Sequence, residues 1–284
     1  MSQGVAVKSL VVPYPGRSKM PVRPVVAKRC GNMDAFSLEK KHIVIVGASS
    51  GIGAKTAEVC ADAGAVVSLC ARREERLQKV ASGLKGNGHG YHVLDVTGEK
   101  KGIEDVFDRF AAERGPIDGL VYSVGVSANL AFGVIRKDAF LKVLDINLVG
   151  AMTTTQAAIG IKRVCKSGCS VVWISSVACS KPSGGGLFMY SASKAGMVGG
   201  VKLLALELAR RNIRVNVLCP GAVKTEIWDQ YILTEKEKNA VFSKHPLGVG
   251  EAEDVANACR YLLSPAARWV TGAEFYIDGG FSLA

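Results

Sequence analysis

Tyr190 and Lys194 are the pair of side chains in this sequence with the clearest chemical use. They stand four positions apart, so a helix through them places the phenol and the amine on one face. A free phenol has a pKa of about 10 and is a poor acid or base at neutral pH. A neighbouring ammonium stabilises the phenolate and brings that pKa nearer to neutrality. The pair predicts proton transfer at a substrate oxygen, although helices also contain such pairs by chance.

A glycine-rich loop after the apolar run Ile43–Val46 is the second candidate site. Glycines let backbone N–H groups approach a pyrophosphate at the start of the next helix, whose dipole favours an anion. The spacing is Gly-x-x-x-Gly-x-Gly and differs from the commoner Gly-x-Gly-x-x-Gly. The strand before it and the helix after it still predict a dinucleotide site, formed by Gly47, Ser49, Ser50, Gly51, Ile52 and Gly53.

The same loop also fits Gly-x-Ser-x-Gly, the turn that presents the nucleophile of a serine hydrolase. Ser49 would then be the nucleophile, and His245 could serve as its base. That fold needs an earlier strand and loop for the oxyanion hole, and residues 1–33 offer neither. We therefore favour the dinucleotide interpretation.

The end of the second predicted strand indicates which dinucleotide binds. A site for NAD commonly has an acidic residue there, which binds the ribose 2′-hydroxyl. Here that position is Ala71, and Arg72 and Arg73 follow. Guanidinium groups suit a 2′-phosphate, so the sequence predicts NADP(H) as the cofactor. Asp95 and Val96, after the third strand, are expected at the adenine.

Short apolar runs alternate with helical patterns from Phe36 onward. The runs lie at 43–46, 65–69, 90–94, 119–123, 170–174, 214–218 and 274–277. Helical spacing lies between them, at 54–63, 74–84, 103–114, 143–164, 192–209 and 252–262. Buried strands separated by helices predict an α/β fold, a doubly wound seven-stranded parallel sheet of Rossmann type with helices on both faces.

Composition and charge exclude several other classes of protein. Of the 284 residues, 48% are hydrophobic and 21% are charged, which is typical of a globular domain. No apolar run approaches the roughly 18 residues that a spanning helix needs. The eight cysteines contain no CxxC pair, so we expect reduced thiols and no metal site. The net charge is +11, but residues 1–33 hold six basic and no acidic residues, so 34–284 carry only +5 (11 − 6). We therefore predict no nucleic-acid binding.

Residues 1–33 differ from the rest of the chain. They contain four prolines and no helical period, so we expect a disordered basic extension, followed by one Rossmann-type domain over 34–284. An upstream start codon, with Met33 as the true start, explains the extension more simply than an organellar transit peptide. We therefore expect a cytoplasmic protein, with organellar import as the minor alternative.

Together these motifs resemble the short-chain dehydrogenase/reductase family, from Phe36 to the end of the chain. The resemblance covers, in family order, the glycine loop, Asp95, Asn147, Ile174-Ser175-Ser176, Tyr190-x-x-x-Lys194, Pro220-Gly221, and Thr271-Gly272 through Asp278-Gly279-Gly280. Seven motifs in register are far more specific than any one of them.

The resemblance implies a role for each of four catalytic residues. Tyr190 exchanges the proton with the substrate oxygen, and Ser176 donates a hydrogen bond to that oxygen. Lys194 lowers the tyrosine pKa and holds the nicotinamide ribose, while Asn147 positions a water in a proton relay. The resemblance places further cofactor contacts at Gly125, Pro220, Gly221, Val223 and Thr225.

Two departures from the family pattern affect these expectations. The family has Asn-Asn-Ala-Gly after the fourth strand, whereas this chain has Tyr122-Ser123-Val124-Gly125, so the usual support of the central strands is in doubt. The interval between Ser176 and Tyr190 is one residue longer than is common. Ser176 remains the predicted hydrogen-bond donor, with Ser175 as the alternative.

The predicted activity is NADP(H)-dependent interconversion of a carbonyl and an alcohol. An apolar substrate would suit the loop residues Phe132, Leu187, Phe188, Trp228, Tyr231 and Phe242. One alternative is a 3-oxoacyl-[acyl-carrier-protein] reductase, for which Arg136, Lys137 and Lys142 would supply a basic surface. Another is a non-catalytic NADP(H)-binding sensor or scaffold. The family resemblance also implies a homodimer or homotetramer built on the two longest helices.

Overall fold

The computed structural model describes residues 34–181, 185–226 and 234–284. Its main sheet has seven parallel strands in the order β3-β2-β1-β4-β5-β6-β9. The strands are β1 (His42–Val46), β2 (Val66–Ala71), β3 (Gly90–Val93), β4 (Gly119–Tyr122), β5 (Cys169–Ile174), β6 (Ile213–Pro220) and β9 (Glu274–Ile277). The strand order reverses between β1 and β4, where sheets of this kind bind their ligands. The predicted parallel, doubly wound sheet is confirmed.

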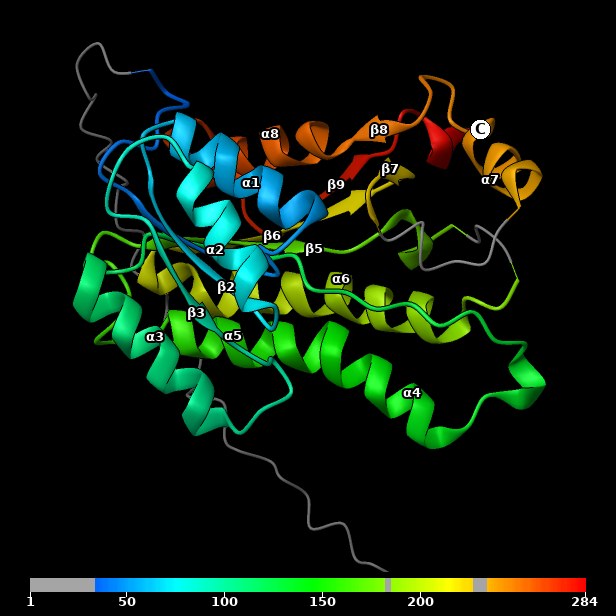
Figure 1. Cartoon of the computed structure of the whole chain (residues 1–284), viewed down its shortest axis with the longest axis horizontal. Coiled ribbons are helices and arrows are strands. Elements are labelled where there is room, and N and C mark those ends of the chain that lie inside the picture. Colours follow the sequence, from blue (N-terminus) through cyan, green and yellow to red (C-terminus); the bar gives the residue numbers. More distant parts are fainter. Residues whose placement is uncertain (1–33, 182–184, 227–233) are drawn as a thin grey trace, which may run out of the picture. The chain divides into compact units, whose positions relative to one another are not determined.

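Helices cover both faces of this sheet (Figure 1). One face carries α3 (Lys100–Arg114), α4 (Lys137–Leu144), α5 (Gly150–Ala158) and α6 (Phe188–Leu208). The other carries α1 (Gly51–Asp62), α2 (Glu74–Gly83) and α8 (Ala252–Leu263). Successive strand residues enter opposite cores, because side chains alternate along a strand: Val44 and Val46 join the first, and Ile43 and Ile45 the second.

Short elements complete the described parts of the chain. Strands β7 (Val223–Lys224) and β8 (Gly250–Glu251) pair in parallel, and α7 (Glu235–Phe242) lies between them in sequence. Single 3-10 turns occur at Phe132–Val134, Val177–Cys179, Ala209–Arg211, Pro265–Ala267 and Phe281–Leu283. We refer to Val177–Cys179 as η3.

The predicted single helix over 143–164 is wrong at both ends and in the middle. Helix α4 begins earlier, at Lys137, and a π-helical turn over Asp145–Val149 separates it from α5, which ends at Ala158. Insertions of this kind are rare and often lie at functional sites. Tyr122 explains its place here, because the buried hydroxyl donates a hydrogen bond to the carbonyl of Ile146 within the turn.

Two further expectations concern residues 1–33 and the absence of a membrane span. The predicted disorder of residues 1–33 falls outside the described residues and stays a prediction. Within the described parts of the chain, no helix is long and apolar enough to cross a membrane.

Candidate active site

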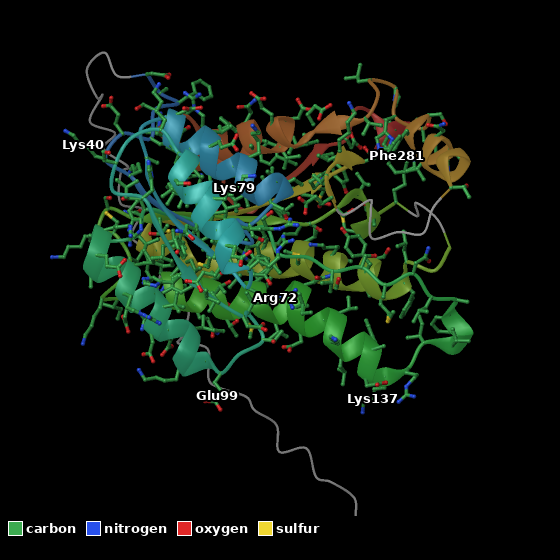
Figure 2. The ribbon with its side chains drawn as sticks, in the orientation of Figure 1. Lys40, Arg72, Lys79, Glu99, Lys137 and Phe281 are labelled. Carbon is green, nitrogen blue, oxygen red and sulfur yellow. The ribbon has the colours of Figure 1, made fainter. Side chains whose placement is uncertain are left out.

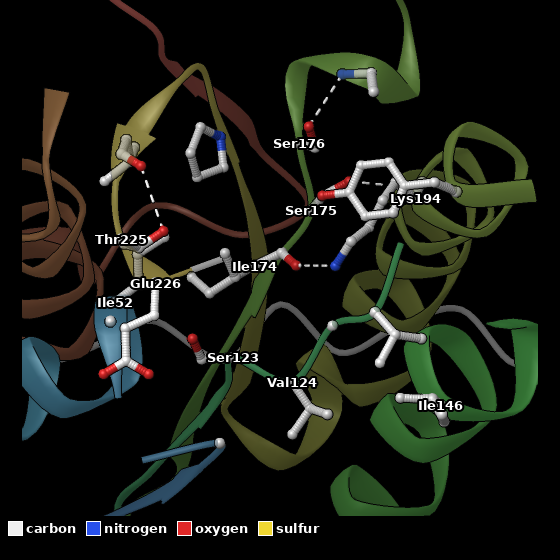
Figure 3. A pocket seen from close by; sticks show the side chains of 18 of the residues that line it. Ile52, Ser123, Val124, Ile146, Ile174, Ser175, Ser176, Lys194, Thr225 and Glu226 are labelled. Atoms are coloured by element: carbon white, nitrogen blue, oxygen red, sulfur yellow. Dashed lines mark hydrogen bonds between the residues drawn. The ribbon is translucent and has the colours of Figure 1, made fainter. Parts of the chain in front are cut away.

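A cleft of about 1060 Å³ lies at the carboxyl ends of the strands. Figure 3 shows its wall, where Ser123 and Val124 follow β4, Ser175 and Ser176 follow β5, and Lys194 reaches in from α6. Most of the predicted site residues line this one cleft: Gly47, Ser49, Ser50, Gly51, Ile52, Arg72, Arg73, Asp95, Val96, Gly125, Ser176, Tyr190, Lys194, Pro220, Gly221, Val223 and Thr225. Gly53 and Asn147 do not line the cleft and lie behind its wall.

The glycine loop is closely packed against β4 and against the start of α1. Gly47 has φ +91°, and a Cβ there would lie 2.8 Å from the backbone carbon of Ser123. A Cβ on Gly53 would lie 2.2 Å from the carbonyl oxygen of Gly47, so α1 approaches the loop as closely as it does only because this residue is glycine. The first turn of α1 holds no acid, and Ser50 makes no side-chain cap. The backbone N–H groups and the positive end of the helix dipole therefore suit a pyrophosphate.

Arg73 connects the end of β2 to this loop. Its Nη2 donates to Ser49 Oγ at 2.9 Å and to Ser50 Oγ at 2.8 Å. Glu226, from the segment after β7, pairs with the same guanidinium at 3.8 Å and also with Arg76. Sequence reasoning missed Glu226, which lies 150 residues from Arg76 and carries no local signal. Exposed guanidinium groups beside this loop could hold a phosphate group.

Asp95 lies in the cleft wall, but its carboxylate is already hydrogen-bonded to Thr97 in the turn after β3. Its Oδ1 accepts hydrogen bonds from Thr97 N at 3.0 Å and Thr97 Oγ1 at 2.8 Å. The backbone hydrogen bond from Thr97 is the main cause that lowers the pKa of Asp95. The carboxylate thus fixes the chain after β3, where Val96 is buried.

Lys194 is buried on α6, with only 3% of its surface exposed. Its Nζ donates to the carbonyl oxygen of Ile174 at 2.8 Å and lies 5.7 Å from the centre of the Tyr190 ring. Burial lowers the pKa of Lys194 to about 8, while charge on Cys219 and Cys179 acts to raise it. The pairing of amine and phenol predicted by their spacing is therefore present at the cleft.

The two serines after β5 have different surroundings. Ser175 is buried and donates to the carbonyl oxygen of Lys194 at 3.0 Å. Ser176 is partly exposed, and its Oγ accepts from Ala178 N at 3.2 Å (Figure 3). Accepting that bond leaves the Ser176 proton available for a ligand, whereas the Ser175 proton is already used. The geometry supports Ser176 as the hydrogen-bond donor.

Asn147 is fully buried in the π-helical turn. Its side chain accepts from Val126 N at 2.8 Å and donates to Val126 O and to Ser193 Oγ, each at 2.9 Å. These bonds use both N–H donors of the amide and one acceptor position of its oxygen, so this side chain holds the loop after β4 against α6. The expectation that Asn147 positions a relay water stays a prediction, and its side chain is engaged with protein groups.

Tyr122 and Ser123 stand where the family has the two asparagines of Asn-Asn-Ala-Gly, and both make hydrogen bonds that support the central strands. The Tyr122 hydroxyl bonds to the π turn, and a Cβ on Gly150 would lie only 2.5 Å from that oxygen. The following Ser123 donates its backbone N–H to Val46 at 2.8 Å. An aromatic residue at a buried strand end was the one available signal for this role.

His245 gives no support to the hydrolase interpretation. Its Nε2 accepts from Ala222 N at 2.9 Å, its Nδ1 lies 3.1 Å from the carbonyl oxygen of Val241, and its ring stacks on Phe281 at 4.7 Å. Both ring nitrogens are thus held by the backbone, and Ser49 is bound by Arg73. His245 is a structural residue that supports the loop beginning at Gly221.

Of the predicted apolar substrate residues that the structure describes, Phe132, Phe188 and Phe242 do not line the cleft. Leu187 lines the cleft, and Phe188 packs against Phe132 and Phe140 with ring centres 5.0 and 5.8 Å apart. Phe132 is 72% exposed, so this aromatic cluster has an open side. Trp228 and Tyr231 lie outside the described residues.

Fold and site together define a Rossmann-type protein with a tyrosine–lysine pair at the carboxyl ends of its strands. A family model described as enoyl-(acyl carrier protein) reductase matches residues 47–282. The chain belongs to the short-chain dehydrogenase/reductase family, whose members are oxidoreductases.

Several known proteins are similar over almost their whole length. The chain is 36% identical over 247 residues to the 3-oxoacyl-[acyl-carrier-protein] reductase FabG of Thermotoga maritima, covering 86% of this chain and 98% of that protein. The identity to the Escherichia coli FabG is 31% over 246 residues, with the same coverage. The chain is 33% identical to carbonyl reductase family member 4 of Danio rerio, covering 84% of this chain and 97% of that protein.

A solved structure with the same fold is a short-chain type dehydrogenase/reductase from Mycobacterium marinum. Its TM-score is 0.80 and its identity 31%, with 88% of this chain and 99% of that one covered.

Proposed function

We propose that the protein is an NADP(H)-dependent oxidoreductase that interconverts a carbonyl and an alcohol, with Tyr190 as general acid and base. The observation that carries this proposal is the buried Lys194 ammonium beside the Tyr190 ring, at a cleft shared with the glycine loop. A sensor or scaffold without catalysis would have no need to bury a charge next to a phenol.

The cleft suits NADP(H) in shape and charge. The loop from Gly47 to Gly53 would present backbone N–H groups to a pyrophosphate at the start of α1, and Arg72 and Arg73 would hold the 2′-phosphate. At the other end, the backbone from Pro220 to Thr225 would hold the nicotinamide. The cofactor supplies the hydride when bound; the residues of this chain supply orientation and proton transfer.

The side chains at the catalytic end act on the substrate oxygen. During reduction Tyr190 donates its proton to that oxygen, and the Lys194 ammonium stabilises the phenolate that remains. Ser176 donates a hydrogen bond to the same oxygen as negative charge develops there. Asn147 keeps the wall in place through Val126.

The substrate class that we favour is a 3-oxoacyl group carried on acyl carrier protein. The similar proteins from Thermotoga maritima and Escherichia coli bear that name. Lys142 lines the cleft, and the exposed residues Arg136 and Lys137 begin the same helix. Figure 2 separates Lys137, at the outer end of α4, from Arg72 near the second strand, so this basic edge is distinct from the phosphate site. Such an edge would suit an acidic carrier protein.

The proposal includes the setting in which the enzyme works. We propose a homodimer or homotetramer and a cytoplasmic location. Reduction of an enoyl group is less favoured, because relatives that perform it space the tyrosine and lysine more widely.

Steady-state assays of NADPH absorbance test the proposal. We expect turnover with acetoacetyl-acyl carrier protein to exceed turnover with the same acyl group on coenzyme A. Simple ketones and trans-enoyl thioesters serve as the comparison substrates. Turnover of simple ketones alone would reject the carrier-protein substrate but retain the carbonyl reductase. NADPH binding with no turnover of any substrate would favour the sensor.

A further inference from the structure

Two cysteines from distant parts of the chain meet beside the active site. Cys179 ends the η3 turn, and Cys219 is the penultimate residue of β6. Their sulfur atoms lie 3.7 Å apart, which is van der Waals contact. Cys219 is fully buried, and Cys179 is partly exposed. One thiol is therefore accessible to a small reagent, and the second lies directly behind it.

The surroundings make the two thiols unequal. The hydrogen bond from Cys219 is the main cause that lowers the pKa of Cys179, and the same contact raises the pKa of Cys219. Ser180 adds a contact at 3.8 Å, whereas the carboxylate of Glu274, also at 3.8 Å, opposes the thiolate. The exposed sulfur is thus the nucleophile and the buried one its partner, because thiolate rather than thiol attacks.

We propose that Cys179 and Cys219 are a modification site, which hydrogen peroxide converts into a disulfide that inactivates the enzyme reversibly. The Cys179 thiolate attacks one peroxide oxygen; an S–O bond forms, the O–O bond breaks, and the leaving hydroxide becomes water. Cys219 then loses its proton and attacks the Cys179 sulfur; the S–S bond forms, the S–O bond breaks, and a second water leaves. The two thiols lose two electrons, which reduce the peroxide to two waters.

The disulfide would distort residues proposed to catalyse the reaction. The sulfur separation must fall from 3.7 Å to about 2.05 Å. Cys179 follows Ser176 by three residues, and Cys219 immediately precedes Pro220 in the cleft wall. A misplacement of about 1 Å can cost about 10²-fold in rate.

The test treats the full-length protein with hydrogen peroxide and maps the products by mass spectrometry. We expect a loss of two hydrogens from the protein, a Cys179–Cys219 cross-linked peptide, and restoration of both thiols by dithiothreitol. NADPH-dependent turnover should fall at least about tenfold and recover with the reductant. The mass change can be measured whether or not the proposed function is right. If the cross-link is missing, this inference alone is rejected. If the protein shows no turnover even with both thiols reduced, the proposed activity alone is rejected.

Matched cysteine variants assign the effect. Cys179→Ser should keep turnover within about twofold and lose the peroxide sensitivity. Cys165→Ser, at the other partly exposed cysteine among the described residues, should remain as sensitive as the wild type. Inactivation of Cys179→Ser by peroxide would overturn the proposal.

Zinc chloride is the second probe, because Cys179, Cys219 and Glu274 bring possible ligand atoms within 4.8 Å of one another. Thiols that resist peroxide but bind zinc stoichiometrically would make the cluster a metal site and also overturn the proposal.

Discussion

The ionisation of Lys194 gives the active site a pH dependence that can be measured. Burial lowers the pKa of Lys194 to about 8, so the ammonium is present below that pH and is lost above it. Without the cation, the phenolate of Tyr190 loses its stabilising charge. We therefore expect kcat/KM for NADPH, which reports the free enzyme, to fall as the pH rises through about 8. A profile that stays flat well into the alkaline range would contradict this assignment.

The proton donor can be removed with the loss of one atom. Tyr190→Phe should lower turnover by about 10²–10⁴-fold, since the general acid is absent, and should leave NADPH binding nearly unchanged. Fluorescence titration with NADPH measures the binding. Tyr91→Phe is the matched control, because Tyr91 lies on β3 within the core on the α1 face. Equal turnover in the two variants would reject Tyr190 as the acid.

The arginines after β2 should distinguish the two nicotinamide cofactors. Arg72→Ala should weaken NADPH about tenfold and leave NADH nearly unchanged, because only NADPH carries the 2′-phosphate. Glu226→Gln is the control in the opposite direction: it removes a carboxylate that competes for Arg73 and should tighten NADPH severalfold. Isothermal titration with both cofactors measures each constant. Equal losses for NADPH and NADH would contradict the proposed phosphate site.

Among the elements, the packing of α1 on the glycine loop allows the least change. Gly53→Ala would place a Cβ 2.2 Å from the Gly47 oxygen. The helix must then move, so we expect a loss of about 1–3 kcal/mol in unfolding free energy and much weaker NADPH binding. Urea denaturation measures the stability. Gly102→Ala in α3 is the matched control, since a Cβ there meets nothing within 4 Å and should be neutral or stabilising. Equal stability changes in the two variants would refute the close-packing argument.

The sequence predicted regular elements better than their interruptions. All seven strands of the main sheet were predicted, because buried parallel strands are short continuous apolar runs. The π-helical turn was missed, since its cause is the contact of Tyr122 with Ile146, which lies 24 residues away. For the same reason no pattern indicated the bond of Asn147 to Val126 or the meeting of Cys179 with Cys219. Spacing predicts side chains that share an element, but it does not predict which elements will touch.

At the scale of the whole molecule, exposed apolar side chains on α5 and α6 are candidates for the subunit interface. Met152 on α5 and Leu203 and Leu206 on α6 are 42%, 60% and 74% exposed. Apolar side chains gathered on neighbouring helices commonly mark an interface between subunits. These two helices carry the residues of the predicted homodimer or homotetramer interface.

A charge on this surface should separate the subunits. We expect Leu206→Glu to shift the protein to the 30.0 kDa monomer in size-exclusion chromatography with light scattering. Ile161→Glu, in the turn after α5, is the control, because Ile161 is 90% exposed and outside these helices. A wild-type protein that is already monomeric would reject the predicted oligomer.

The partner of the Lys194 amine belongs to the main chain. Because Nζ donates to the peptide oxygen of Ile174, no side-chain replacement at position 174 can remove that acceptor. The acceptor oxygen belongs to the last residue of β5, and the pairing of β5 with β6 fixes its place. Substitutions at position 174 can therefore change the size and polarity of the side chain there while the Lys194 amine keeps its hydrogen bond to the main chain. Detaching the amine from that oxygen requires a change at Lys194 itself or a movement of α6 relative to the end of β5.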